Sequence, residues 1–195
     1  MRSDGEATRA RILAAARSEF AQHGLAGARV DRIAQEAKAS KERLYAYFGD
    51  KRSLFEAVLA LNLQETLEQV PGDADDLPGF VGQLFDHVNE HPEHLRMLTW
   101  ARLEQESDLL PRSPGHRPGP RIPDVARAQA AGLVDPGWDP DDLIRLLFSL
   151  ATAWANSPEG EFSAAETPET AARARSRRRA AAVTAACRLL ELPQP

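Results

Sequence analysis

Three histidines and a glutamate lie close together near the middle of the chain. His87 and His91 are four residues apart and, with Glu90, match the H-x-x-E-H pattern of inverted zinc peptidases, and His94 follows. Residues i and i+4 share one face of a helix, as zinc binding by two imidazoles requires. Pro92 directly after the second histidine, and the lack of a large catalytic domain around it, argue against an enzyme. We therefore expect no catalytic residue, metal or cofactor, and a regulatory metal or acid-sensing role for the histidines stays open.

A second group of polar side chains lies between residues 40 and 51. Charged residues at 41–43 follow Ser40, which is a natural N-cap, so they would occupy the first turn of a helix. Tyr45 and Tyr47 are two residues apart and cannot both face one core, so at least one lies at the surface. These residues alone favour two interpretations about equally: a solvated helix face and a contact with nucleic acid.

The elements that would position this group are four helices in the first 70 residues, which contain no proline. Apolar residues at helical spacing are Ile12, Leu13, Ala16 and Phe20, then Val30, Ile33, Ala34 and Ala37, then Leu44, Tyr45, Tyr47 and Phe48. The first helix is expected to end at His23–Gly24, and Gly49–Asp50 to open the fourth. Two short helices after a supporting helix, separated by a three- to four-residue break, are typical of a helix-turn-helix.

The segment from Val30 to Lys51 closely resembles the DNA-binding segment of TetR-family transcriptional regulators. The resemblance covers about residues 6–66 and rests on I-A-x-x-A in the second helix, S-x-x-x-L-Y-x-Y-F in the third and the lysine that opens the fourth. It implies an all-α fold of about nine helices, with a three-helix DNA-binding domain over 6–66 and an effector-binding and dimerisation domain over 67–195. It also implies a homodimeric repressor, not an enzyme, released from a pseudo-palindromic double-stranded DNA operator by an unknown small-molecule effector.

The resemblance also implies a role for each matched residue. The charged residues 41–43 would read base edges, since Arg and Lys contact guanine and Glu accepts a hydrogen bond from cytosine. The two tyrosines and Lys51 would contact phosphate and set the register. The predicted DNA-binding residues are Arg29, Ser40, Lys41, Glu42, Arg43, Tyr45, Tyr47 and Lys51.

The sequence departs from the family pattern at two places. Ala28 and Arg29 stand where a Thr or Ser usually caps the second helix and reaches phosphate. Arg29 is expected to take over the phosphate contact, and the cap stays open. Lys38 stands where a glycine is common, so it would need a left-handed conformation that costs about 1 kcal/mol.

After residue 70 the pattern indicates five further helices. They run over 78–90, from 92 to about 107, over 124–133, from 139 to 156 and from 167 to 192, with an irregular proline-rich connection over 111–123. The residues predicted to line an effector pocket are Phe85, Val88, Met97, Trp100, Leu103 and Phe148. Those predicted for the dimer interface are Leu143, Leu147, Leu150, Trp154, Val183, Cys187 and Leu190. For any single one of them, packed core is the simpler interpretation.

The arginine run over 173–179 is expected to be a solvated helix face or to form salt bridges to acids such as Asp141 and Asp142 across the dimer interface. A DNA-binding module that acts without an effector remains an alternative to the ligand-released repressor.

Composition agrees with helices. The 195 residues include 33 Ala and 23 Leu but 8 Val and 4 Ile. The longest uncharged stretch, 146–158, is too short to span a membrane, and a charged N-terminus with a single cysteine makes the cytoplasm the default compartment. The net charge of −5 divides into +4 over residues 1–52 and −9 over 53–195. DNA is therefore expected to meet the N-terminal part.

Overall fold

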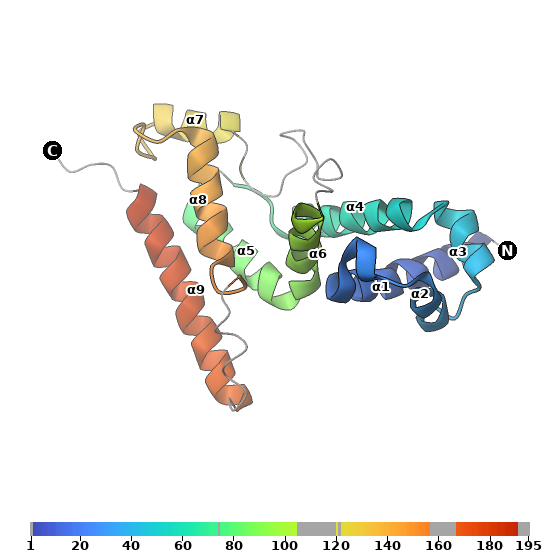
Figure 1. The fold of residues 1–195 in the computed structure, drawn as a ribbon. Coiled ribbons are helices and arrows are strands. Elements are labelled where there is room, and N and C mark those ends of the chain that lie inside the picture. Colours follow the sequence, from blue (N-terminus) through green and yellow to red (C-terminus); the bar gives the residue numbers. More distant parts are fainter. Residues whose placement is uncertain (1, 74, 105–119, 121, 157–166, 191–195) are drawn as a thin grey trace. The chain divides into compact units, whose positions relative to one another are not determined.

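The computed structural model describes residues 2–73, 75–104, 120, 122–156 and 167–190. Within these ranges the regular elements are nine helices (Figure 1). They are α1 Arg2–Gly27, α2 Val30–Glu36, α3 Lys41–Phe48, α4 Lys51–Gln69, α5 Leu77–Glu90, α6 Pro92–Leu103, α7 Ile122–Ala130, α8 Pro140–Thr152 and α9 Pro168–Leu190. The all-α prediction is confirmed. In the described part of the chain, no helix combines the length and apolar character that crossing a bilayer requires.

The chain forms two compact units. The first unit comprises residues 1–65 and 91–112, and the second comprises residues 66–90 and 113–195. The first unit therefore contains α1, α2, α3, the whole of α6 and α4 up to Glu65. The second contains the end of α4 together with α5, α7, α8 and α9.

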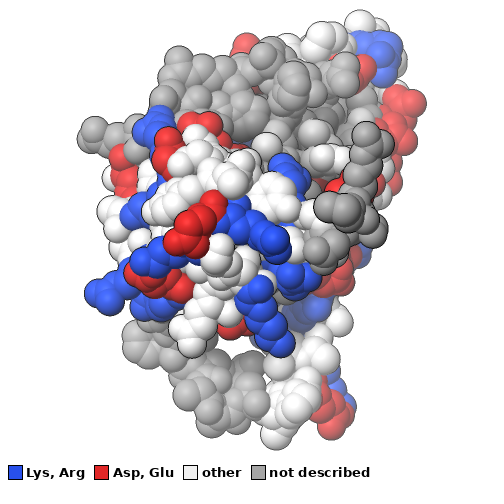
Figure 2. Space-filling view, turned by 90° about the vertical axis from the view of Figure 1, so that its right-hand side faces the viewer, with Lys and Arg blue, Asp and Glu red and all other residues white. Residues whose placement is uncertain are grey.

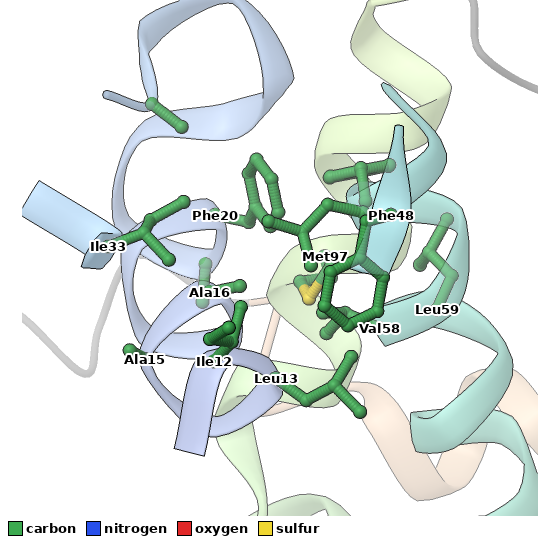
Figure 3. Packing of buried hydrophobic residues seen from close by; sticks show 14 of the residues in the cluster. Ile12, Leu13, Ala15, Ala16, Phe20, Ile33, Phe48, Val58, Leu59 and Met97 are labelled. Carbon is green, nitrogen blue, oxygen red and sulfur yellow. The ribbon is translucent and has the colours of Figure 1, made fainter. Parts of the chain in front are cut away.

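The core of the first unit is built around α1. The predicted apolar face of α1 is buried, and the inward residues of α2 and α3 pack on it together with α4 and α6 (Figure 3). The rings of Phe20 and Phe55 meet edge to face at 5.0 Å, and Met97 of α6 is fully buried in the same cluster. Each large side chain buried here contributes about 1.5–3 kcal/mol. This packing fixes α2 and α3 against α1.

The straight part of α1 ends at Gly24, where the backbone adopts φ 67° and ψ −176°, as the sequence predicts. A Cβ atom at this position would come within 2.6 Å of Glu104 Oε1 and 2.8 Å of the Trp100 ring. Glycine is therefore required both by the positive φ and by the close approach of α6.

In the second unit, α5 is the central helix. Its buried residues include Phe80, Leu84 and Phe85, and it packs on both α8 and α9. Asp139 caps α8 as predicted, because its carboxylate accepts hydrogen bonds from the backbone N–H groups of Asp141 and Asp142.

Some helix ends differ from the sequence prediction. α7 begins at Ile122 rather than at residue 124, because Pro123 is tolerated within a first helical turn, and it ends at Ala130, two residues before Gly132 at φ 71°. α8 ends at Thr152 and is followed by turns through 156. α6 ends at Leu103, with Glu104 as its C-cap, and not near 107 as predicted. Residues 111–119 and 121 of the proline-rich connection lie outside the described residues, as does the predicted end of α9 at 192.

Candidate DNA-binding interface

The α3 helix presents one buried and one open face. Leu44 and Phe48 are 0% and 8% exposed, whereas the residues between and before them lie at the surface, including Tyr45 at 44% and Tyr47 at 39%. Both tyrosines are thus at the surface. Figure 2 looks onto this end of the first unit and shows Lys and Arg side chains gathered over it, with acidic ones among them. The predicted base-reading residues 41–43 all lie on the open face.

The start of α3 is held by Ser40. Its hydroxyl oxygen accepts a hydrogen bond from the backbone N–H of Arg43 at 3.2 Å, and its own backbone is extended, as in a regular N-cap. The pKa of Glu42 lies below its ordinary value, because its own backbone N–H and then the Ser40 hydroxyl donate to its carboxylate. Glu42 is therefore an ionised acceptor at neutral pH, as a contact with a cytosine amino group requires.

The turn between α2 and α3 contains the strained lysine that the sequence predicts. Lys38 has φ 50°, and it is the one non-glycine residue with positive φ in the described part of the chain. The backbone N–H of Ala39 reaches back to the carbonyl of Ala34 at 3.0 Å, which closes the end of α2. Arg11 of α1 donates from Nε to the carbonyl of Ala37 at 3.2 Å and so ties the turn to α1.

The start of α2 is held by a residue that the sequence analysis missed. Arg29 is the N-cap and makes no side-chain cap hydrogen bond. Glu19 of α1 accepts a hydrogen bond from the Arg29 backbone N–H at 2.8 Å and pairs with the Arg32 guanidinium at 2.7 Å. A carboxylate from α1 thus stands near the positive end of α2, and the Arg29 side chain remains exposed.

Three predicted DNA-binding side chains have partners within the first unit. Lys51 Nζ donates to the carbonyls of Ala26 at 3.3 Å and Ala28 at 3.2 Å, and so closes the connection between α1 and α2. The Tyr47 hydroxyl donates to the Gly5 carbonyl at 3.1 Å. Lys41 forms an ion pair with Asp31 of α2. These contacts set the orientation of α3 and α4 in the isolated chain.

The six residues predicted for an effector pocket belong to two units. Phe85 and Val88 are buried on α5, and Phe148 lies half-buried on α8, all in the second unit. Met97, Trp100 and Leu103 belong to α6 of the first unit, where Trp100 donates to the Ala21 carbonyl at 3.2 Å and Leu103 is 70% exposed. The second unit brings Phe85 against Trp154 instead, with their rings edge to face at 6.1 Å.

The residues predicted for the dimer interface divide by exposure. Leu143, Leu147 and Leu190 are buried inside one chain, which leaves their side chains almost no surface for a second subunit. Those that keep exposed surface are Leu150, Trp154, Val183 and Cys187. An open hollow of about 270 Å³ lies between α8 and α9, lined by Leu146, Ser149, Leu150, Ala185 and Leu189.

The arginines of α9 find acidic partners on their own helix and on α5. Arg179 pairs with Asp86 at 2.7 Å and Arg175 with Glu90 at 3.2 Å. Asp141, which the sequence suggests as a partner across the dimer interface, pairs within one chain with Arg145 of its own helix at 2.6 Å. In one chain these arginines thus tie α9 to α5.

The histidine pattern of zinc peptidases is not assembled. The two ring nitrogens of His87 lie 2.9 Å from Thr66 Oγ1 and 2.9 Å from Gln69 Oε1, so hydrogen bonds occupy the atoms that would bind zinc. His91 and His94 belong to the first unit, where their rings stack at 5.0 Å. His87 thus belongs to a different unit from the other two.

Comparisons with known proteins agree with this geometry. Residues 12–58 match the family described as bacterial regulatory proteins of the tetR family, and residues 76–188 match the tetracyclin repressor-like C-terminal domain. Over 154 residues, the chain is 41% identical to the HTH-type transcriptional repressor SCO4008 of Streptomyces coelicolor, covering 78% of this chain and 80% of that protein. It is 30% identical over 138 residues to the HTH-type transcriptional repressor NicS of Pseudomonas putida, covering 65% of each.

Among solved structures, the transcriptional regulator SCO4942 of Streptomyces coelicolor is similar with a TM-score of 0.80 and 42% identity. The similarity covers 95% of this chain and 99% of that one. The likeness therefore extends over both units and is not confined to the helix-turn-helix.

Proposed function

Because the chain belongs to the TetR family of bacterial transcriptional regulators, we propose that it is a repressor that binds a pseudo-palindromic operator as a homodimer and is released by a small-molecule effector. The family consists of regulators and not of enzymes, so membership excludes the zinc-peptidase interpretation of the histidines. The observation that carries the proposal is the capped start of α3, which holds the charged residues 41–43 at the open surface. Two relatives that are named as repressors support the direction of control.

The proposed mode of binding follows from the shape of α3. The helix enters the major groove with its N-terminal turn first, so Arg43 meets guanine edges and Glu42 accepts from cytosine. Arg29, Tyr45, Tyr47 and Lys51 contact phosphates on either side and fix the register. In a dimer, two such helices about 34 Å apart read successive half-sites.

The surface proposed for the second subunit is the face of α8 and α9 around the open hollow. Leu146 is 39% exposed there, and Leu150, Ala185 and Leu189 line the same depression. Small and branched apolar side chains allow close packing of two helix pairs into a four-helix bundle. The α8–α9 face would thus set the distance between the two copies of α3.

Release by an effector requires a ligand that binds one spacing of the dimer better than the other. The free energy of DNA binding then becomes less favourable, at most by the difference between the ligand's binding free energies for the two states. We place the effector in the second unit, beside Phe85 and Val88 of α5 and Phe148 of α8. The first two are buried and the third is half-buried, so the ligand must open this packing to bind.

The test is operator selection with the purified full-length chain, followed by footprinting and titration of the selected site. Arg43→Ala is expected to lower affinity about 5- to 100-fold and to relax sequence choice, because one base contact is lost. Tyr47→Phe should weaken binding more evenly across sequences, since a phosphate contact carries no sequence information. Arg127→Ala, which removes the same charge from α7, serves as the control and should leave affinity unchanged.

Two results would contradict the proposal. One is the absence of any protected site together with unchanged DNA binding in both variants. The other concerns the effector: if no compound in a broad library raises the melting temperature or releases the operator, the chain acts as a DNA-binding module without a ligand.

A further inference from the structure

Two histidines and two glutamates of the first unit lie together where α6 begins. His91 is the N-cap of α6, and Glu93 and His94 lie in its first turn. Glu65, in the part of α4 that belongs to the same unit, faces this turn. Each of His91, Glu93 and His94 offers one ligand atom within 4.8 Å of the other two. None of these residues lies on the α2–α3 surface that we assign to DNA.

The spacing of these atoms is close to that of a metal shell. His91 Nδ1 lies 3.6 Å from Glu93 Oε1, and His94 Nε2 lies 3.9 Å from the same oxygen. Two ligand atoms bound to a tetrahedral zinc ion, each about 2.1 Å from the metal, are about 3.4 Å apart. Small side-chain rotations therefore bring the three atoms around one ion.

The local backbone explains why the two imidazoles face the same way. Pro92 holds the first helical position, and the backbone N–H of His94 bonds to the His91 carbonyl at 3.1 Å. The two rings stack at 5.0 Å with an angle of 16° between their planes. Unlike Ser40 at the start of α3, His91 makes no side-chain cap hydrogen bond to its helix. Its ring lies instead beside the His94 ring and the Glu93 carboxylate.

Glu65 approaches His94 from α4, outside the group of three whose ligand atoms lie within 4.8 Å of one another. Its Oε2 lies 3.3 Å from His94 Nε2, and its Oε1 pairs with the Arg17 guanidinium of α1 at 2.8 Å. One oxygen thus faces the histidine while the arginine holds the other. A carboxylate held in this way is oriented for coordination, as outer partners orient ligands in metal sites.

We propose that His91, Glu93 and His94, with Glu65 as a fourth ligand, bind one divalent transition-metal ion of the zinc type. Two imidazoles with carboxylates suit Zn²⁺, Co²⁺ and Ni²⁺ better than Mg²⁺ or Ca²⁺, which prefer oxygen ligands alone. His94 is 6% exposed, whereas the other three side chains are about one-third exposed, so an ion reaches the site from solvent. A bound ion would join α4 to α6 and, through Glu65 and Arg17, to α1.

The test uses the full-length chain without a histidine tag, stripped with a chelator and titrated with Co²⁺. We expect one Co²⁺ per chain, with the strong visible absorption of a four- or five-coordinate site, and displacement by Zn²⁺ but not by Mg²⁺. His91→Ala and Glu93→Gln should each weaken Co²⁺ binding about tenfold or more. Both side chains are partly exposed, so the variants should fold, and their melting temperatures without metal provide the check.

The matched control is His23→Ala. His23 also lies near a carboxylate in the first unit, Glu19 at 3.8 Å, but it stands outside the cluster. Zinc should raise the melting temperature of the wild-type chain and of His23→Ala, but not that of Glu93→Gln. The proposal is overturned if stripped protein takes up no Co²⁺, if His91→Ala binds Co²⁺ as the wild type does, or if His23→Ala loses binding equally. Because no DNA is present, this outcome is independent of operator binding.

Discussion

The carboxylate of Glu104, which directly follows α6, accepts a hydrogen bond from the backbone N–H of Leu25 at 2.7 Å. Its second oxygen accepts from the N–H of Ala26 at 3.0 Å. After Gly24 the chain starts a new turn whose first N–H groups have no helical carbonyl to bind. Glu104 thus acts as an N-cap supplied by another helix, and α6 helps to hold the segment that leads from α1 into α2.

Glu104→Ala should therefore destabilise the protein. One half-buried and one exposed N–H group lose a charged acceptor, which we expect to lower the free energy of unfolding by about 1–3 kcal/mol in urea denaturation. Glu104→Gln keeps one acceptor oxygen and should cost less. Glu36→Ala, at the exposed end of α2, is the control and should change stability by less than about 0.5 kcal/mol. Equal losses for Glu104→Ala and Glu36→Ala would refute this role.

The conformation of Lys38 predicts that a substitution at this position stabilises the protein. At φ 50° a lysine side chain costs about 1 kcal/mol relative to glycine. Lys38→Gly should therefore stabilise the protein by up to about 1 kcal/mol, part of the gain being offset by the greater freedom of glycine in the unfolded chain. Lys38→Ala retains the Cβ atom and should bring no gain. Thermal unfolding of the three proteins decides between them, and a less stable Lys38→Gly would contradict the expectation.

The features that the sequence predicts well in the first unit are local. Helical spacing indicates that Leu44 and Phe48 are buried, and the residue type identifies Ser40 as a cap. Each of these depends on neighbours within about one helical turn. A single sequence carries that information directly.

The features that it does not predict depend on contacts between distant residues. Glu19 stands ten residues before Arg29, on another helix, and no local pattern relates them. Periodicity on α8 likewise indicates that Leu143 and Leu147 are buried, but it does not distinguish packing within one chain from packing against a second one. The three-dimensional arrangement shows the former for these two residues, whereas Leu146 keeps exposed surface.

The ion pair between Lys41 and Asp31 sets up a prediction about DNA affinity. Both side chains are more than half exposed, so the pair itself contributes little to stability. Asp31→Asn removes a negative charge beside the base-reading turn and frees the Lys41 ammonium. Operator affinity should rise about threefold or more at low salt, and this gain should shrink as salt screens the charges.

The control for this change is Asp124→Asn. Asp124 also forms an exposed ion pair with an arginine of its own element, Arg127 of α7 at 2.9 Å, and the substitution changes the net charge equally. It should leave operator affinity within error of the wild type. If Asp31→Asn binds no better than Asp124→Asn across a salt series, then Lys41 does not contact DNA in the way proposed.

Asp50 gives the protein a defined sensitivity to acid. Its pKa lies below the ordinary value of 3.8, because the backbone N–H of Ser53, at 2.7 Å, and then the Ser53 hydroxyl donate to the carboxylate at the start of α4.

A group whose pKa is lower in the folded state stabilises the protein above its unfolded pKa, and the contribution is lost as the pH falls through the folded pKa. Asp50→Asn should thus be less stable than the wild type near neutral pH, and the difference in stability should shrink as the pH falls below the ordinary pKa of 3.8 and through the lower folded-state pKa. Urea denaturation at a series of pH values measures it, with Glu36→Gln as the control for an exposed carboxylate. Parallel stability curves for Asp50→Asn and the wild type would show that Asp50 does not hold the start of α4 through its charge.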